Sequence, residues 1–168
     1  EAGGSLEECK KLGDKVNKNS GSMGVALTSC SVPAAGKPNF EIGDDEMEFG
    51  VGIHGEPGRR RDKIKSAQEI TSELLEAINE DLKPESNEEI LLFVNGMGGT
   101  PLTELYLIFD NAKNVLDKKN IKISRSLVGN YCTSLEMQGV SITLTKLDEE
   151  LAKHWDSSVL TAAMRWGM

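Results

Sequence analysis

The stretch ILLFVNGMGGTPLTELYLIF, residues 90–109, decides the fold class of this chain. Its first five residues form an uninterrupted apolar run, which is typical of a strand buried on both faces. Thr100 is a good N-cap and Pro101 a good first helical residue, so a helix is predicted to begin there. A further strand is predicted at residues 121–128. Strand, helix and strand in succession indicate a right-handed crossover between parallel strands.

Hydrophobic periodicity predicts the remaining elements of the chain. Helices are expected at residues 5–19 and 64–78, with a short helix that Asp148 caps and that runs through Trp155, and strands at residues 23–31, 46–54 and 140–145. The helix after Pro101 is expected to end at Asn120 and to bury Leu102, Leu105, Tyr106, Phe109, Ala112, Val115 and Leu116. No internal repeat or linker divides the sequence. These elements favour a single α+β domain, residues 1–168, with a mixed β-sheet and flanking helices.

The bulk composition limits the classes of protein that fit. The chain has 168 residues, of which 38% are hydrophobic and 27% charged, as is ordinary for a soluble globular domain. Its formal net charge of −8 argues against nucleic acid as the main partner, because phosphate binding needs a cationic surface. No apolar run approaches the roughly 18 residues of a membrane span, and no signal peptide is visible. A cytoplasmic protein is therefore expected.

The cysteines and histidines do not form a metal site in the sequence pattern. Cys9, Cys30 and Cys132 are odd in number and widely spaced, so reduced thiols are favoured over a disulfide framework. No cluster of histidine, cysteine and carboxylate has metal-ligand spacing. His154 follows apolar residues of the C-terminal helix and is expected to be an ordinary surface or partly packed histidine.

Two glycine-rich segments resemble phosphate-binding motifs. Residues 50–55 match G-x-G-x-x-G, but this fingerprint needs a helix directly after the glycines, and Glu56-Pro57-Gly58 follows instead, so a dinucleotide site is not expected. Residues 96–100 lie between a strand and a helix and could cradle an anion. They lack the lysine of a P-loop, and a tight turn that only glycine fits is favoured over a direct phosphate role.

The stretch EMEFGVGIHGEPG, residues 46–58, contains the strongest candidate for chemistry. Apolar residues alternate with glycines up to His54, and the glycines clear space around its imidazole. A lone histidine is usually structural. A neutral imidazole, with an unperturbed pKa of about 6.5, is nevertheless a base or a nucleophile at cytoplasmic pH, and the glycines favour such a role here.

A basic cluster of Arg59, Arg60 and Arg61 follows the same turn. A solvated loop is favoured for these residues. Contact with an anionic partner or a phosphate is the alternative.

Four sequence blocks together resemble the substrate-binding K subunit of dihydroxyacetone kinase. The blocks are SVPAAGKPNF (31–40), EMEFGVGIHGEPG (46–58), FVNGMGGTPLTELY (93–106) and VGNYCTSLEMQGVSITLTKLDEEL (128–151). The resemblance runs in order over essentially the whole chain, and it covers the second domain, the C-terminal half of the subunit. It implies that an earlier α/β domain, absent here, supplies most polar contacts to the substrate and an acid/base carboxylate.

The resemblance also implies a role for individual residues. In the family, the histidine of the G-I-H-G-E-P-G block bonds covalently to the substrate carbonyl as a hemiaminal, and that residue here is His54. Such a bond would separate dihydroxyacetone from glycerol, which has no carbonyl, where shape alone is worth only about 1–3 kcal/mol. Further pocket or partner contacts are expected from Gly52, Gly55, Glu56, Gly98, Gly99 and Thr100.

The resemblance implies partners as well. No cofactor or metal is expected on this chain, because ADP or ATP with magnesium sits on a nucleotide-binding L subunit. The ending AAMRWGM, residues 162–168, favours the phosphoenolpyruvate-dependent bacterial type, in which a multiphosphoryl carrier recharges the nucleotide. A homodimer is expected, and the isolated chain is expected to be inactive. The alternative is a non-enzymatic relative that binds dihydroxyacetone and coactivates a transcription regulator.

Overall fold

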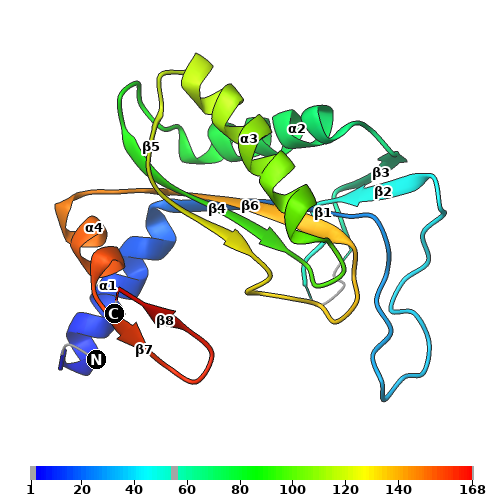
Figure 1. Cartoon of the computed structure of the whole chain (residues 1–168), viewed down its shortest axis with the longest axis horizontal. Coiled ribbons are helices and arrows are strands. Elements are labelled where there is room, and N and C mark those ends of the chain that lie inside the picture. Colours follow the sequence, from blue (N-terminus) through cyan, green and yellow to red (C-terminus); the bar gives the residue numbers. More distant parts are fainter. Residues whose placement is uncertain (1–2, 54–56, 168) are drawn as a thin grey trace.

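The computed structural model describes residues 3–53 and 57–167 of the chain. Its elements, in chain order, are α1 (Leu6–Lys18), β1 (Ser20–Ala26), β2 (Glu46–Phe49), β3 (Arg60–Lys63), α2 (Ala67–Leu82), β4 (Glu89–Gly96), α3 (Leu102–Lys118), β5 (Lys122–Gly129), β6 (Gly139–Lys146), α4 (Glu149–Asp156), β7 (Val159–Leu160) and β8 (Arg165–Trp166). Figure 1 shows their arrangement around one central sheet.

The central sheet is mixed, as predicted. Its six strands follow the order β3-β2-β1-β6-β4-β5. The strands β4 and β5 run parallel and are joined through α3, which confirms the parallel crossover expected from residues 90–128. The other pairs in this sheet are antiparallel. A mixed sheet with flanking helices is therefore confirmed.

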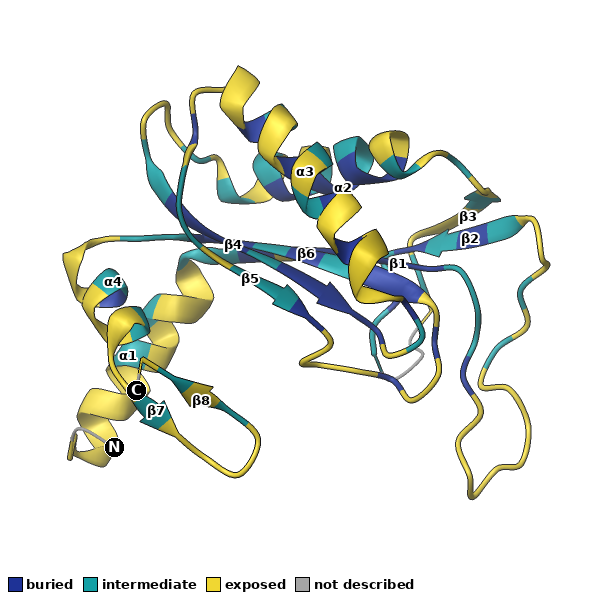
Figure 2. Cartoon of the chain, in the orientation of Figure 1, coloured by how far each residue is buried: buried dark blue, intermediate teal, exposed yellow. Residues whose placement is uncertain are grey.

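The helices α2 and α3 cover one face of this sheet (Figure 1). Alternate residues of β1, β4 and β6 point at these helices, because successive side chains of a strand lie on opposite faces. The resulting core contains Val25, Leu74, Leu75, Ile78, Ile90, Leu92, Val94, Leu105, Ala112, Leu116, Ile142 and Leu144, all of them almost completely buried. Figure 2 shows this buried layer between the two helices and the strands. The fold is thus held mainly from one side.

The opposite face of the sheet is polar in part, and a second, smaller cluster of buried apolar residues lies around Ala26 of β1, with Cys30, Val51, Met97 and Met137. Hydroxyl groups pair across β1 and β6, with 2.8 Å between the oxygens of Ser20 and Thr145 and 2.7 Å between those of Ser22 and Thr143. The helices α1 and α4 and the β7–β8 hairpin gather near one end of the sheet, away from α2 and α3 (Figure 1). No residue of α1 is buried. This face therefore has a smaller apolar cover than the face under α2 and α3.

Side-chain caps explain where three of the helices begin. Ser5 and Glu8 form a capping box on α1, and Ser66 and Glu69 form another on α2. Asp148 caps α4 by accepting a hydrogen bond from the backbone N–H of Leu151 at 2.9 Å, which confirms the predicted cap.

The predicted start of α3 is wrong by one residue. Pro101, not Thr100, is the N-cap, and it makes no side-chain hydrogen bond. The hydroxyl of Thr100 donates to the backbone oxygen of Gly139 at 2.7 Å and accepts from its N–H at 2.8 Å. Thr100 therefore ties the start of α3 to β6 instead of capping the helix.

Two predicted elements differ in their boundaries. The first strand spans Ser20–Ala26, not residues 23–31. The helix predicted from residue 64 begins only after its cap at Ser66, and the Ile64 side chain, 48% exposed, precedes it. The capping box at Ser66 sets the start of α2, which hydrophobic periodicity alone placed too early.

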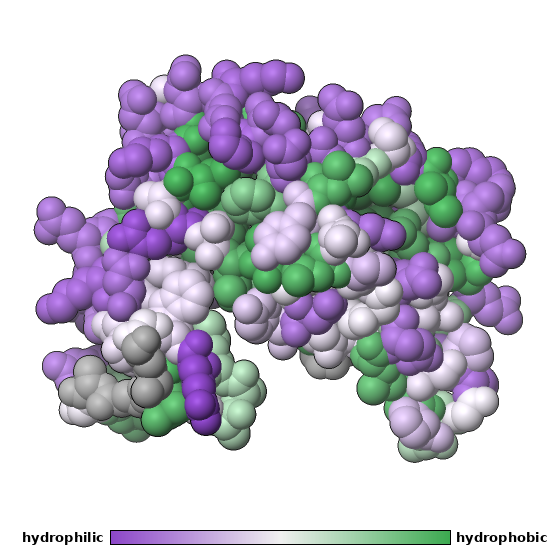
Figure 3. Space-filling view, in the orientation of Figure 1, coloured by the Kyte–Doolittle hydropathy of each residue, from purple (hydrophilic) through white to green (hydrophobic). Residues whose placement is uncertain are grey.

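The buried face of α3 was predicted only in part. Leu105, Ala112 and Leu116 are buried, but Leu102 and Tyr106 are 48% and 54% exposed. Ile108, which the prediction omitted, is buried instead. Apolar surface, green in Figure 3, gathers in the middle of this view, and hydrophilic surface covers the outer parts of the helices.

Candidate functional site

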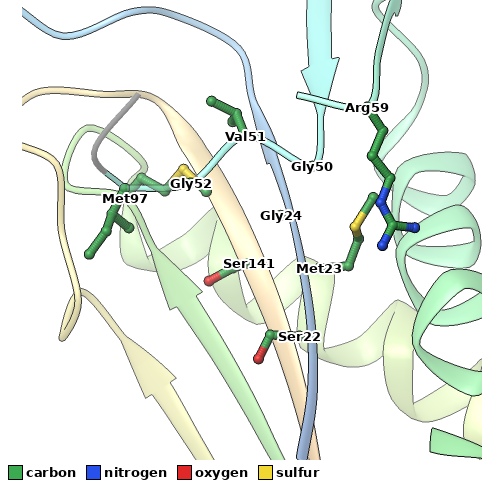
Figure 4. Close-up of a pocket in the computed structure, with 10 residues that line it drawn as sticks. Ser22, Met23, Gly24, Gly50, Val51, Gly52, Arg59, Met97 and Ser141 are labelled. Carbon is green, nitrogen blue, oxygen red and sulfur yellow. The ribbon is translucent and has the colours of Figure 1, made fainter. Parts of the chain in front are cut away.

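A cavity of about 300 Å³ opens beside the end of β2. It is lined by Ser22, Met23, Gly24, Gly50, Val51, Gly52, Ile53, Arg59, Met97 and Ser141. Figure 4 shows the labelled lining residues, which come from β1, β6, the segment after β2, the residue before β3 and the turn after β4. The segment of residues 50–53 leads directly into His54. We refer to this space as the candidate cavity.

Two glycines keep the candidate cavity open. A side-chain carbon on Gly24 would lie 2.9 Å from the terminal methyl carbon of Met97 and 3.3 Å from the backbone oxygen of Val51. Gly50 has a φ of +79°, a conformation that residues with a side chain rarely adopt. A side-chain carbon there would lie 2.9 Å from Cγ of Arg59. Glycine is thus required at Gly50, whereas a side chain at Gly24 would displace the end of Met97 and narrow the cavity.

The strand predicted at residues 46–54 is shorter than expected. It ends at Phe49, because the left-handed conformation of Gly50 turns the chain out of the sheet. The two motif glycines Gly50 and Gly52 therefore follow the strand instead of lying within it. The next described element is a strand, β3, and not a helix, which agrees with the exclusion of a dinucleotide fingerprint.

Both ends of the loop between β2 and β3 are held by hydrogen bonds. At the first end, the N–H of Gly50 donates to the backbone oxygen of Gly24 at 2.7 Å. At the second end, the N–H of Arg59 donates to the backbone oxygen of Phe49 at 2.6 Å. The N–H of Gly58 donates to the Glu48 carboxylate at 2.8 Å. The loop that carries the candidate histidine is therefore closed at its base.

Glu48 is the side chain that links this loop base to β3. Its second carboxylate oxygen accepts a hydrogen bond from the Arg61 guanidinium at 2.7 Å, and its side chain is 14% exposed. The Arg61 hydrogen bond, assisted by the Gly58 N–H, lowers the pKa of the Glu48 carboxyl. Glu48 is therefore ionised at neutral pH, which strengthens both hydrogen bonds.

The arginine cluster was predicted to be a solvated loop; its three members are exposed, as predicted, but two of them do not lie in a loop. Arg60 and Arg61 begin the edge strand β3. The guanidinium of Arg60 lies 4.5 Å from the centre of the Phe49 ring and pairs with Asp62 and Glu73. Opposite charges on β2, on β3 and on α2 thus hold this strand, an arrangement that short-range sequence patterns do not reveal.

The sequence-predicted site residues fall into three groups. His54, Gly55 and Glu56 lie outside the described residues. Gly52 lines the candidate cavity. The remaining three, Gly98, Gly99 and Thr100, are not among the residues that line it.

The glycine-rich turn after β4 uses its polar groups internally. The N–H of Gly98 donates to the Asn130 side chain at 3.1 Å, and that of Gly99 donates to the backbone oxygen of Met137 at 2.8 Å. A side-chain carbon on Gly98 would lie 1.9 Å from the backbone oxygen of Leu135. The close packing agrees with a tight turn that only glycine fits. These two amides are not available to an anion.

Sequence patterns missed several residues of the candidate cavity. Ser22 and Ser141 lie on β1 and β6, where Gly24 is directly opposite Ser141 in the strand register. More than a hundred residues separate the two strands in the chain, and no local signal pairs them. Met97 was noted only as part of the glycine-rich turn. Arg59 was noted only as a member of the basic cluster.

The described residues contain neither a metal site nor a membrane-spanning helix. Over residues 3–53 and 57–167, no three histidine, cysteine, aspartate or glutamate side chains come together as a metal site would require. None of the helices in these ranges has the length and apolarity that a transmembrane span needs. Cys9, Cys30 and Cys132 are free thiols, and His154 is exposed, as expected.

Comparison with known proteins gives consistent matches over most of the chain. The dihydroxyacetone-binding subunit DhaK of PTS-dependent dihydroxyacetone kinase 1 from Listeria innocua is 46% identical over 150 residues, which are 89% of this chain and 46% of that protein. The corresponding subunit of the PEP-dependent kinase from Escherichia coli is 39% identical and covers 99% of this chain and 54% of that protein. The chain thus spans about half the length of these relatives.

A solved structure agrees with the sequence matches. The dihydroxyacetone kinase operon co-activator Dha-DhaQ superposes with a TM-score of 0.85 at 31% identity, over 93% of this chain and 49% of that one. The family model described as Dak1 domain matches residues 1–163. With a match over nearly its whole length, this chain belongs to the Dak1 domain family.

Proposed function

We propose that this chain is the substrate-binding part of a dihydroxyacetone kinase, in which His54 holds dihydroxyacetone as a covalent hemiaminal. The observation that carries the proposal is the candidate cavity of about 300 Å³, lined by Gly50, Val51, Gly52 and Ile53, the four residues directly before His54. The two kinase relatives compared above are named dihydroxyacetone-binding subunits. A cavity at the start of this segment is where such a substrate would be held.

The chemistry needs a neutral imidazole and a carbonyl. A ring nitrogen of His54 attacks the carbonyl carbon, a carbon–nitrogen bond forms, the carbonyl oxygen takes up a proton and the imidazole releases one. The whole substrate is added and nothing is lost. Glycerol cannot form this bond, so selectivity comes from bond formation rather than from the small differences in shape. The adduct also holds the terminal hydroxyl in place for phosphoryl transfer.

The proposal includes a second domain outside this chain. The residues described around the candidate cavity offer two serine hydroxyls, backbone groups and one arginine, but no carboxylate. An acid or base for the substrate hydroxyl would then come from elsewhere, and we assign it to the preceding α/β domain of a two-domain subunit. The length of the relatives, about twice the matched region, supports this division.

The phosphoryl donor is assigned to a partner L subunit that carries nucleotide and magnesium. The names of the relatives, one PTS-dependent and one PEP-dependent, support the phosphoenolpyruvate-dependent type, in which a multiphosphoryl carrier recharges ADP on the partner. A homodimer of the substrate-binding subunit stays a prediction.

Intact mass spectrometry under gentle conditions tests the carbonyl addition. The full-length subunit and the 168-residue chain are each incubated with dihydroxyacetone or glycerol, and the measurement is repeated with His54→Ala. We expect a mass gain of one dihydroxyacetone on the full-length subunit, absent with glycerol and with the variant. An adduct that survives in His54→Ala, or no adduct on any form, would overturn the covalent role of His54.

A second candidate function is a dihydroxyacetone-sensing coactivator of a transcription regulator. The similarity to the co-activator structure, at a TM-score of 0.85, favours it. Adduct formation does not separate the two functions, because both need the bound triose. The separating measurement is phosphoryl transfer to dihydroxyacetone after addition of the nucleotide-bearing subunit. Product formation supports the kinase, and an adduct without transfer supports the coactivator.

A further inference from the structure

Arg59 is the charged residue of the candidate cavity. Of the ten residues that line it, the other nine are glycine, serine, methionine, valine or isoleucine. Figure 4 shows the Arg59 side chain extending from the loop just before β3 alongside Met23. Among the described residues that line the cavity, the Arg59 guanidinium is thus the one charged group. This positive charge stands out because the chain as a whole carries a formal net charge of −8.

The position of Arg59 depends on the backbone of the neighbouring segment. Its N–H bonds to the backbone oxygen of Phe49 at 2.6 Å, which fixes where the side chain starts. Its Cγ occupies space that a side chain on Gly50 would fill, at 2.9 Å. The left-handed glycine therefore makes room for the stem of Arg59 at the wall of the cavity.

The two following arginines have different surroundings. Arg60 lies over the ring of Phe49 and pairs with Glu73 of α2. Arg61 pairs with Glu48 at 2.7 Å and lies 3.7 Å from Glu46. Neither lines the candidate cavity. Of the basic cluster, Arg59 alone is therefore placed to meet a ligand there.

The charge of this side chain does not match a neutral triose. Dihydroxyacetone has hydroxyl and carbonyl groups, which the two serines and the backbone can bind. Phosphorylation replaces a neutral hydroxyl by a group with a charge of about −1.5 to −2 at pH 7 and three strong acceptor oxygens. A planar guanidinium matches such a group in charge and in geometry, and can donate two parallel hydrogen bonds to it.

We propose that Arg59 is the phosphate-binding residue of the candidate cavity, and that it binds the phosphate of a triose phosphomonoester. The inference rests on the proposed function for the identity of the triose. The anion site itself does not depend on His54.

Binding of dihydroxyacetone phosphate and of inorganic phosphate to the full-length subunit tests the assignment by titration calorimetry. The variants are Arg59→Gln and Arg59→Lys, with Arg60→Gln and Lys63→Gln as controls. The two controls remove one positive charge from β3 without touching the cavity. Adduct formation with dihydroxyacetone is measured on every variant by intact mass.

We expect Arg59→Gln to weaken binding of dihydroxyacetone phosphate at least about tenfold, as for loss of a charge-assisted hydrogen-bond pair. Arg59→Lys should recover part of this affinity, and both controls should bind like the unmodified protein. Dihydroxyacetone should still form its adduct on all variants. Weakened phosphate binding with an intact adduct therefore supports both proposals.

Other outcomes separate the two proposals. If Arg59→Gln binds dihydroxyacetone phosphate and inorganic phosphate like the unmodified protein, or if the controls weaken binding equally, the assignment is overturned. If both Arg59 variants lose the adduct together with phosphate binding, Arg59 acts on the shape of the cavity and the assignment is also overturned. If no adduct forms on the unmodified protein but inorganic phosphate binds through Arg59, the proposed function fails and the anion site stands.

Discussion

The two faces of the central sheet differ in what they contribute to the molecule. The face under α2 and α3 buries side chains such as Leu74, Leu92 and Leu105 completely. The opposite face presents paired hydroxyls, such as Ser22 with Thr143, and residues of its two central strands line the candidate cavity. Burial of apolar area is the main stabilising term in folding. The comparison teaches that stability depends mainly on the face with the larger apolar cluster, while the other face carries a smaller cluster and the candidate cavity.

The largest effect is expected from a cavity-creating change on the helix-covered face. Leu92→Ala should lower the free energy of unfolding by about 2–5 kcal/mol, because Leu92 is completely buried. Thr143→Ala, on the opposite face of the neighbouring strand, removes one hydroxyl pair and should lower it by about 1 kcal/mol or less. Urea unfolding with an unchanged slope measures both. Equal losses would contradict the asymmetry between the faces.

A smaller effect is expected at the base of the loop. Glu48→Gln should lower the free energy of unfolding by about 1–2 kcal/mol, because the carboxylate accepts hydrogen bonds from Arg61 and Gly58. Asp45→Asn removes an exposed ion pair with Lys63 and serves as the control, with little change expected.

The effect of Glu48→Gln should also depend on pH with a defined sign. Because the pKa of Glu48 is lowered in the folded protein, its contribution is fully present above the unfolded pKa of about 4.3. It is lost as the pH falls through the lower folded value. The difference between Glu48→Gln and the unmodified protein should therefore be full at pH 7 and should shrink below about pH 4. A difference that grows in acid would show that another interaction is responsible.

In the candidate cavity, a substitution is expected to reduce binding while changing stability little. Gly24→Ala adds a methyl group that meets the flexible end of Met97, which can move, so the free energy of unfolding should change by less than about 1 kcal/mol. The same methyl group narrows the cavity and should reduce the yield of the dihydroxyacetone adduct several-fold. Gly13→Ala, in α1 with open space around it, is the control and should leave the adduct unchanged. A full adduct yield in Gly24→Ala would place binding elsewhere.

The smallest effect is expected where α1 meets α4. Lys15 lies 2.5 Å from both Asp148 and Glu150, and its hydrogen bond lowers the pKa of the Asp148 carboxyl. The pairing is thus fully present above the unfolded pKa of aspartate, about 3.9, and is lost as the pH falls through the lower folded value. Hydrogen exchange should show loss of protection in α1 under acid or in high salt, with α2 unchanged. Equal loss in both helices would contradict a locally held α1.

Most of the fold followed from local patterns. The alternation in β6, the apolar run in β4 and the cap at Asp148 each predicted an element that the structure confirms. The errors fall where contacts distant in sequence decide. Thr100 bonds to Gly139 instead of capping α3. The arginines after the turn form an edge strand because β2 and carboxylates on β2, β3 and α2 hold them.

Less of the candidate site than of the fold could be predicted from the sequence. The segment that leads to His54, the spare space provided by Gly50 and the basic cluster after it could all be noted in the sequence. The partners from other strands, Ser22 and Ser141, could not, because only the pairing of β1 with β6 in the middle of the sheet brings them to the same cavity. Likewise, no local pattern distinguishes Arg59 from its two neighbours.

The sequence by itself determined the mixed sheet, the helices and the Dak1 domain family, because periodicity, caps and long characteristic blocks are local properties of the chain. Only the tertiary structure decided which face of the sheet is covered, where the strand before His54 ends and which arginine reaches the candidate cavity. Those features depend on backbone conformation and on contacts between residues far apart in the chain, such as Gly24 with Gly50. They form only when the strands pair.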